Sequence, residues 1–157
     1  MADSLQVVAF RLCEDRYAVN IQQVQEIIRY ERPRSLAGTD PSITGLINLR
    51  GKIIPICDLK LRLGAEPGLD PGAARIVVVE CPLGLVGVIV DAVEEVRTLL
   101  PESREALPEG TPRGGGLIGV AKVDDRLLVL LDPAELFVDA PVEVEDAAAV
   151  DELPRAA

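Results

Sequence analysis

The chain has 157 residues and a formal charge of −10, which suits one domain or two very small ones. Because phosphate contacts need a clustered basic face, this acidic balance argues against nucleic-acid binding. No apolar stretch approaches the roughly 20 residues that a membrane helix needs, and the sequence does not open with a secretory signal pattern. We therefore expect a cytoplasmic protein without direct membrane insertion.

The residues that usually carry catalysis are scarce. The sequence contains no histidine, which removes the commonest general base and every Ser/His/Asp or Cys/His arrangement. Cys13, Cys57 and Cys81 lie far apart without CxxC spacing, so the sequence indicates neither a disulfide framework nor a thiolate metal cage. The glycine run at 114–116 lacks the Lys-Ser/Thr of a phosphate loop. We expect no enzyme activity, no cofactor and no metal.

Short apolar runs alternate with polar breaks near the N-terminus, which predicts β-strands joined by turns. The expected extended segments are Leu5–Leu12, Tyr17–Val19 and Gln25–Tyr30. Asn20 can cap one short helical turn between the second and third of these segments. The stretch Glu31–Ser42, with its Pro, Gly and Asp residues, predicts a loop.

The next stretch, Thr44–Gly64 (TGLINLRGKIIPICDLKLRLG), predicts a hairpin followed by a short helical turn. Gly51 can take the positive φ that a tight return needs, and the β-branched residues of Ile53–Cys57 favour a strand. Asp58 can cap the helical turn that follows. Arg50 is a permanent cation with apolar neighbours, so it must lie in water at the turn or pair with an acid.

The second half of the chain repeats the first. Ala18–Ile27 (AVNIQQVQEI) aligns without gaps on Gly87–Val96 (GVIVDAVEEV), a shift of 69 residues, and GLI at Gly45 recurs at Gly116, a shift of 71. The Pro- and Gly-containing segment 65–74 separates the two copies. Short strands in a period of this size predict an all-β fold with two similar small barrels.

The two copies differ at the hairpin. The first has Asn48 to Gly51 (NLRG), whereas the second has GVAK at 119–122 and an Asp124-Asp125 turn. The fold itself therefore does not require Arg50, which we interpret as retained for a partner surface or for the seam between the halves. Asp132 predicts a capped helical turn at the end of the second copy, as Asp58 does for the first.

Four motifs in order resemble the CheW-like family of chemotaxis coupling proteins: VQEII, GLINLRGKIIPICDLKLRLG, VDAVEEV and LLDPAEL. The resemblance runs from about Gln6 to Phe137. It implies two five-stranded SH3-like or OB-like barrels within a domain at 1–138, with repeat units of roughly 5–64 and 74–138. It also implies an adaptor that joins the cytoplasmic tip of a chemoreceptor to the regulatory domain of a CheA-type histidine kinase. The acidic remainder, 139–157, is expected to be a disordered tail.

The resemblance places partner contact at residues around one groove, namely Val24, Glu26, Leu49, Arg50 and Gly51. We predict a partly buried ion pair between Glu26 and Arg50 that fixes this groove, with Glu95 in the place of Glu26 in the second copy. Kinase contact in the family uses the barrel ends, and the resemblance assigns no residues to it. The sequence does not distinguish flagellar from pilus or other outputs, nor which receptor and kinase are bound.

Two alternatives stay open at this point. An OB-like nucleic-acid-binding barrel would need aromatic side chains that stack on bases, and the chain has only two Phe and two Tyr without an interleaved basic patch. A thiol-based redox sensor would need a cysteine of low pKa. Cys57 is followed by Asp58, and an adjacent carboxylate opposes thiolate formation.

Overall fold

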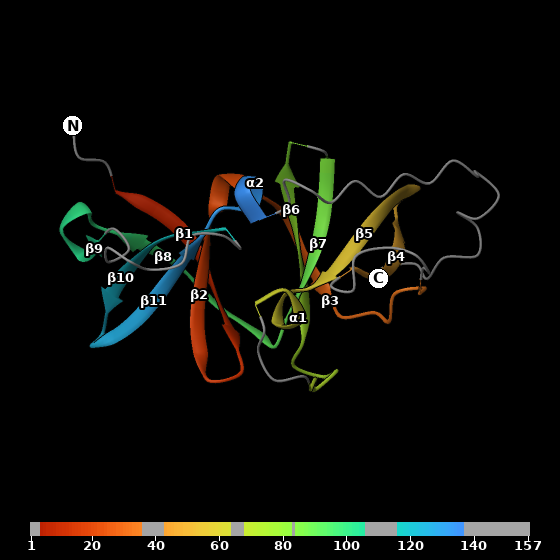
Figure 1. Cartoon of the computed structure of the whole chain (residues 1–157), viewed down its shortest axis with the longest axis horizontal. Helices are drawn as coiled ribbons and strands as arrows, with labels where there is room; N and C mark the ends of the chain where they lie inside the picture. Colours follow the sequence, from red (N-terminus) through yellow and green to blue (C-terminus); the bar gives the residue numbers. More distant parts are fainter. Residues whose placement is uncertain (1–3, 36–42, 64–67, 83, 106–115, 137–157) are drawn as a thin grey trace.

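The computed structural model describes residues 4–35, 43–63, 68–82, 84–105 and 116–136 (Figure 1). Its helical elements are α1 (Leu59–Leu63), α2 (Pro133–Leu136) and the 3-10 turns η1 (Ile21–Gln23) and η2 (Pro101–Ser103). Its strands are β1 (Leu5–Leu12), β2 (Asp15–Asn20), β3 (Val24–Arg29), β4 (Ile43–Leu49), β5 (Lys52–Asp58), β6 (Arg75–Cys81), β7 (Gly84–Val90), β8 (Ala92–Leu99), β9 (Arg104–Glu105), β10 (Leu117–Val123) and β11 (Arg126–Leu131).

The strands form two sheets that lie side by side in Figure 1. Sheet A has six strands in the order β8-β1-β2-β11-β10-β9, and sheet B has five in the order β3-β6-β7-β5-β4. The chain passes from sheet A to sheet B between β2 and β3, through η1, and returns between β7 and β8, at Asp91. These two crossovers are the covalent links between the sheets.

Each sheet combines strands from both sequence copies, because the copies exchange their first hairpins. The hairpin β1–β2 joins β8, β10 and β11, while β6–β7 joins β3, β4 and β5. The orders of the two sheets then match position for position, including the parallel pairs β2–β11 and β7–β5. A bulge falls at Gln25 in β3 and at Glu94 in β8, which are 69 residues apart. The structure therefore supports the predicted duplication, although no sheet is built from one unit alone.

The hairpin in the second half corrects the shift of 71 residues inferred from the GLI match. Arg50 and Gly51 occupy the turn between β4 and β5 with φ of 51° and 86°, and Asp124 and Asp125 occupy the turn between β10 and β11 with φ of 52° and 61°. Arg50 thus corresponds to Asp124, a shift of 74. The two hairpins are therefore matched by the positions of their turns, because turn geometry fixes the register of a hairpin and a three-letter sequence match does not.

The same register makes Gly45 equivalent to Gly119, and both glycines lie where another backbone passes close. A Cβ on Gly45 would lie 2.0 Å from the carbonyl oxygen of Arg34, and one on Gly119 would lie 3.0 Å from that of Glu105. Arg34 exchanges two backbone hydrogen bonds of 2.9 Å with Leu46 of β4. The segment that follows β3, at one edge of sheet B, thus pairs with β4 at the opposite edge.

Gly45→Ala is expected to be more destabilising than Gly119→Ala by about 1 to 3 kcal/mol, because the new methyl group would overlap a backbone carbonyl oxygen at 2.0 Å in the first variant and only approach one at 3.0 Å in the second. Urea unfolding of both variants at equal protein concentration measures the difference. Equal losses would mean that the segment around Arg34 shifts freely and does not hold the edge of sheet B.

Alternation along the central strands builds the core. In β6, Ile76 and Val78 face a cluster belonging to sheet B, while Val77 and Val79 face a cluster shared by both sheets. Both faces of the strand are thus buried, which explains its continuous apolar run. The equivalent strand β1 divides its side chains in the same way, with Val7 and Ala9 in the sheet A cluster and Phe10 and Leu12 in the shared cluster.

The predicted all-β class is confirmed, with two strand-rich sheets and short helices. Sheet A has one strand more than expected because Arg104–Glu105 adds β9 beside β10. Both sheets curl, but among the described residues the strand ladders do not run around either of them as a closed barrel. The expected tail, 139–157, lies outside the described residues. No helix in the described segments combines the length and apolar character needed to span a membrane.

Candidate protein-binding site

The predicted contact between Glu26 and Arg50 is confirmed. The Arg50 guanidinium donates from Nη1 to Glu26 Oε1 at 2.7 Å and from Nη2 to Oε2 at 3.0 Å, a two-point contact. Glu26 comes from β3 and Arg50 from the turn between β4 and β5, so the pair joins opposite edges of the curled sheet B.

The burial of this pair differs between its partners. The Glu26 side chain is 21% exposed, whereas the Arg50 side chain is 75% exposed. The prediction of a partly buried pair therefore holds for the acid alone, because the turn projects the guanidinium beyond the edge of the sheet. Exposed ion pairs contribute about 1 kcal/mol or less, so the contact orients Arg50 more than it stabilises the fold.

Backbone strain marks the same turn. Arg50 has a left-handed φ of 51°, which costs an ordinary residue roughly 1 to 2 kcal/mol and which Asn, Asp or Gly adopts more readily. Asn48 is buried and its Oδ1 accepts a 2.8 Å hydrogen bond from the Gly51 N–H, which holds the turn closed. The contacts around the turn therefore hold it in this conformation, even though the conformation is unfavourable for an arginine.

The other residues predicted for the groove have different surroundings. Gly51 is exposed, and a Cβ there would meet no atom within 4 Å. Leu49 is buried in the sheet B cluster, and Val24 is half-buried against the shared cluster. The structure therefore joins Glu26 to the turn that contains Arg50 and Gly51, whereas the side chains of Leu49 and Val24 pack in two different clusters.

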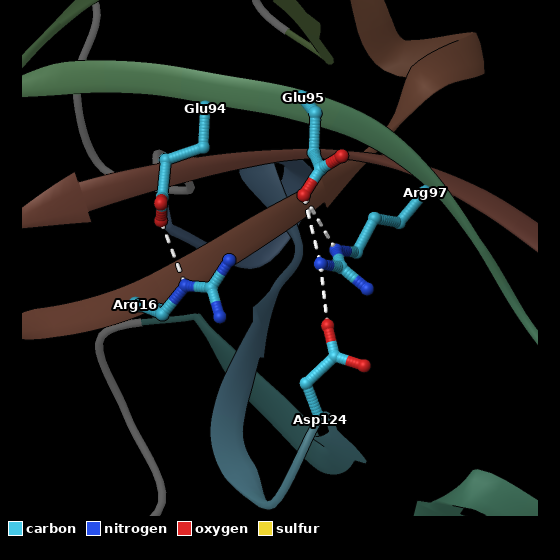
Figure 2. Close-up of polar contacts among 5 residues, drawn as sticks. All are labelled: Arg16, Glu94, Glu95, Arg97 and Asp124. Carbon is cyan, nitrogen blue, oxygen red and sulfur yellow. Dashed lines mark hydrogen bonds and ion pairs between the residues drawn. The ribbon is translucent and has the colours of Figure 1, made fainter.

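Sheet A carries a different ion pair at the equivalent place (Figure 2). Glu95 stands where Glu26 does. Arg97 of β8 donates from Nε to Glu95 Oε1 at 3.0 Å and from Nη2 to Asp124 Oδ2 at 2.7 Å. The hydrogen bond to Asp124 raises the pKa of Arg97 above its ordinary value. The arginine thus comes from the strand rather than from the turn, so the exposed guanidinium at a turn is specific to sheet B.

A second pair on sheet A lies beside this network in Figure 2. Arg16 Nε donates to Glu94 Oε1 at 2.7 Å, which ties β2 to the bulge of β8. Nearby, burial raises the pKa of the Tyr17 phenol, and the charge of Asp15 acts in the same direction. Phe10 stacks on Tyr17, with ring centroids 6.2 Å apart.

Two further features of the described residues concern metal binding and the cysteines. No group of three or more Cys, Asp or Glu residues among them could hold a metal ion. Cys57 is fully buried in the shared cluster, away from solvent oxidants. Sequence reasoning missed the role of Asn48, and also a buried contact between Lys60 and Asp91. A polar residue two places before a hairpin turn is the signal that could have revealed Asn48.

Two β-sheets that share a buried cluster, with an exposed arginine held by a carboxylate at one hairpin turn, define a small all-β protein. The chain belongs to the CheW-like family, whose domain model matches residues 6–140. A probable chemotaxis protein CheW of Rhizobium etli is 31% identical over 141 residues, covering 88% of this chain and 90% of that protein.

Two further relatives agree with this assignment. The chemotaxis protein CheW of Klebsiella aerogenes is 32% identical over 140 residues, covering 87% of this chain and 84% of that protein. Among solved structures, the scaffolding protein TtCheW from Thermoanaerobacter tengcongensis has a TM-score of 0.78 at 35% identity and covers 92% of this chain and 95% of that one. The predicted family is confirmed, and the relatives support a coupling role in chemotaxis.

Proposed function

We propose that the chain is a cytoplasmic adaptor that couples the tip of a chemoreceptor to the regulatory domain of a CheA-type histidine kinase and has no catalytic activity of its own. Membership of the CheW-like family supports the coupling role. The absence of histidine from the whole sequence supports the lack of catalysis.

The proposed contact surface for the receptor tip rests on one observation, the conformation and exposure of Arg50. Arg50 adopts an unfavourable φ of 51°, is 75% exposed, and is held in place by two hydrogen bonds from its guanidinium to Glu26. The equivalent turn of sheet A is made by Asp124 and Asp125 instead. Arg50 is strained and the fold does not require it, which favours a binding role for this residue. Arginine is also enriched at the centres of protein interfaces.

The five predicted residues then divide by role. Arg50, Gly51 and Glu26 form the contact surface for the receptor tip. Val24 and Leu49 support the strands that carry this surface, because Val24 of β3 packs against the shared cluster and Leu49 of β4 is buried in the sheet B cluster. A partner approaching Gly51 meets bare backbone, which permits close approach.

The adaptor role predicts that the purified chain raises phosphorylation by a CheA-type kinase only when a receptor-tip fragment is also present. The chain itself should not bind ATP in calorimetry. Receptor-dependent phosphorylation with and without the chain, at fixed kinase and receptor concentrations, measures the effect. ATP turnover by the chain alone would contradict the proposal. So would receptor-dependent phosphorylation that is the same with and without the chain.

A further inference from the structure

The two crossovers hold the sheets together in different ways. At the second crossover, Asp91 is the single residue between β7 of sheet B and β8 of sheet A. Its backbone N–H donates to the carbonyl oxygen of Arg11 at 3.0 Å, and its Oδ2 accepts a 2.6 Å hydrogen bond from the backbone N–H of Cys13. Arg11 belongs to β1 and Cys13 to the turn after it, so both bonds tie Asp91 to sheet A.

The other carboxylate oxygen ties Asp91 to sheet B. Asp91 Oδ1 accepts a 2.7 Å hydrogen bond from Nζ of Lys60. Lys60 lies in α1, which follows β5 directly and is capped by Asp58, whose Oδ1 accepts from the Lys60 N–H at 3.0 Å. The Lys60 amine also donates to the carbonyl oxygen of Gly68. One carboxylate therefore bridges a turn of sheet A and a helix anchored on sheet B.

This pair is more buried than the pairs described above, of which Arg16–Glu94 is the least exposed at 12% and 30%. The side chains of Lys60 and Asp91 are 5% and 16% exposed. Removing two charges from water is expensive, and such a pair rarely stabilises a fold more than packed apolar side chains would. What it does supply is a defined geometry, because the carboxylate can meet both donors only when the two sheets hold one mutual orientation.

The first crossover, between β2 and β3, can be compared with the second, because among the described residues it has no ion pair equivalent to that of Lys60 and Asp91. There Asp132 caps α2 by accepting from the Ala134 N–H at 2.9 Å, as Asp58 caps α1. Ala134 occupies the position equivalent to Lys60, and the link is a 3.0 Å hydrogen bond from Gln23 Nε2 to Asp132 Oδ1. The fold can therefore make a crossover without a buried lysine, so Lys60 serves a purpose beyond chain connectivity.

Apolar contact already keeps the sheets attached. The shared cluster contains Phe10 and Leu131 from sheet A together with Val77 and Val88 from sheet B, all of them buried. Apolar packing of this kind is non-directional. Association of the sheets and their mutual orientation can thus depend on different residues.

We propose that Lys60 and Asp91 are positioning residues that set the orientation of sheet A relative to sheet B, and thereby the geometry in which two partners bound to the adaptor face each other. The part of this inference that concerns partners rests on the proposed function. The part that concerns orientation stands by itself and can be measured on the chain alone.

The test compares Lys60→Met/Asp91→Asn, which removes both charges at similar volume, with Lys60→Arg, which keeps the charge. Arg16→Met is a matched control, because the pair of Arg16 with Glu94 lies within sheet A. Residual dipolar couplings of backbone amides report the orientation of each sheet. We expect one alignment tensor to fit both sheets in the wild type, Lys60→Arg and Arg16→Met, and two differently oriented tensors to be needed for the double variant.

The partner arm measures coupling between sites. Calorimetry of the kinase regulatory domain binding to the chain, with and without a receptor-tip fragment, gives the factor by which one partner changes the affinity of the other, and such factors are typically about 5 to 150. We expect the double variant to bring this factor within about twofold of one, with little change in either single affinity, and Lys60→Arg to restore it.

Failures of the two ideas are distinguishable. A wild-type chain that binds neither partner would contradict the proposed function but leave the dipolar couplings as a valid test of orientation. A double variant that keeps a single wild-type tensor would overturn the orientation proposal. So would a double variant that fails to fold, because the pair would then hold each sheet rather than the angle between them.

Discussion

Lys60→Met is expected to lower the free energy of unfolding by roughly 3 to 5 kcal/mol, the range typical when one partner of a buried ion pair is removed. The Asp91 side chain is 16% exposed in the wild type, and the methionine removes its paired cation and leaves the Cys13 N–H as a donor. Urea unfolding at pH 7, followed by far-ultraviolet circular dichroism, measures the loss.

The double variant Lys60→Met/Asp91→Asn should recover most of this loss, because no uncompensated charge stays buried and the asparagine oxygen can still accept from Cys13. Arg97→Met serves as the control, since its partners Glu95 and Asp124 have side chains 53% and 69% exposed. That substitution should cost about 1 kcal/mol or less. Additive losses from Lys60→Met and Asp91→Asn would show that the two side chains do not interact.

The extent to which the sequence predicts this structure depends on how local each signal is. Hairpins, turns and helix caps depend on neighbouring residues, so the strand at Leu5–Leu12 and the caps at Asp58 and Asp132 follow from residue type and spacing. The partner of Arg50 was also predictable, because Glu26 is an acid at a repeated position near the same groove.

The exchange of hairpins between the copies was not predictable in this way. Each copy contains a hairpin that could pair with its own strands or with those of the other copy, and the hydrophobic pattern is the same in both cases. The contact between Lys60 and Asp91 depends on this exchange, because Asp91 lies at a crossover that exists only in the exchanged arrangement. The exposure of Arg50 depends on how strongly sheet B curls, which is a property of the assembled sheet.

The resemblance identified the candidate site more closely than residue patterns could. It grouped Val24 and Leu49 with the surface residues, and the structure shows that their side chains pack inward. A motif records which positions are used together, but it does not separate side chains that touch a partner from those that support the surface. Burial makes that separation here.

Arg50→Asn is expected to separate stability from binding. Asparagine tolerates the left-handed φ of 51° at this turn, and Asn-Gly is a favoured pair for a hairpin of this type. The relief of strain offsets the loss of an exposed ion pair, so the free energy of unfolding should stay the same or rise by up to about 1 kcal/mol. Receptor-tip affinity should fall at least tenfold, about 1.4 kcal/mol, if Arg50 is a central contact.

A double-mutant cycle with Glu26→Ala and Arg50→Ala separates the two roles of the pair. Because the arginine is largely exposed, the coupling energy measured by urea unfolding should be about 1 kcal/mol or less. The coupling measured by receptor-tip affinity should be larger, since Glu26 holds the guanidinium in its binding position through two hydrogen bonds. Arg50→Lys should restore little, because an ammonium group cannot make that two-point contact. If Arg50→Asn kept full affinity, the partner surface would have to lie elsewhere on the chain, and the strain at Arg50 would need another explanation.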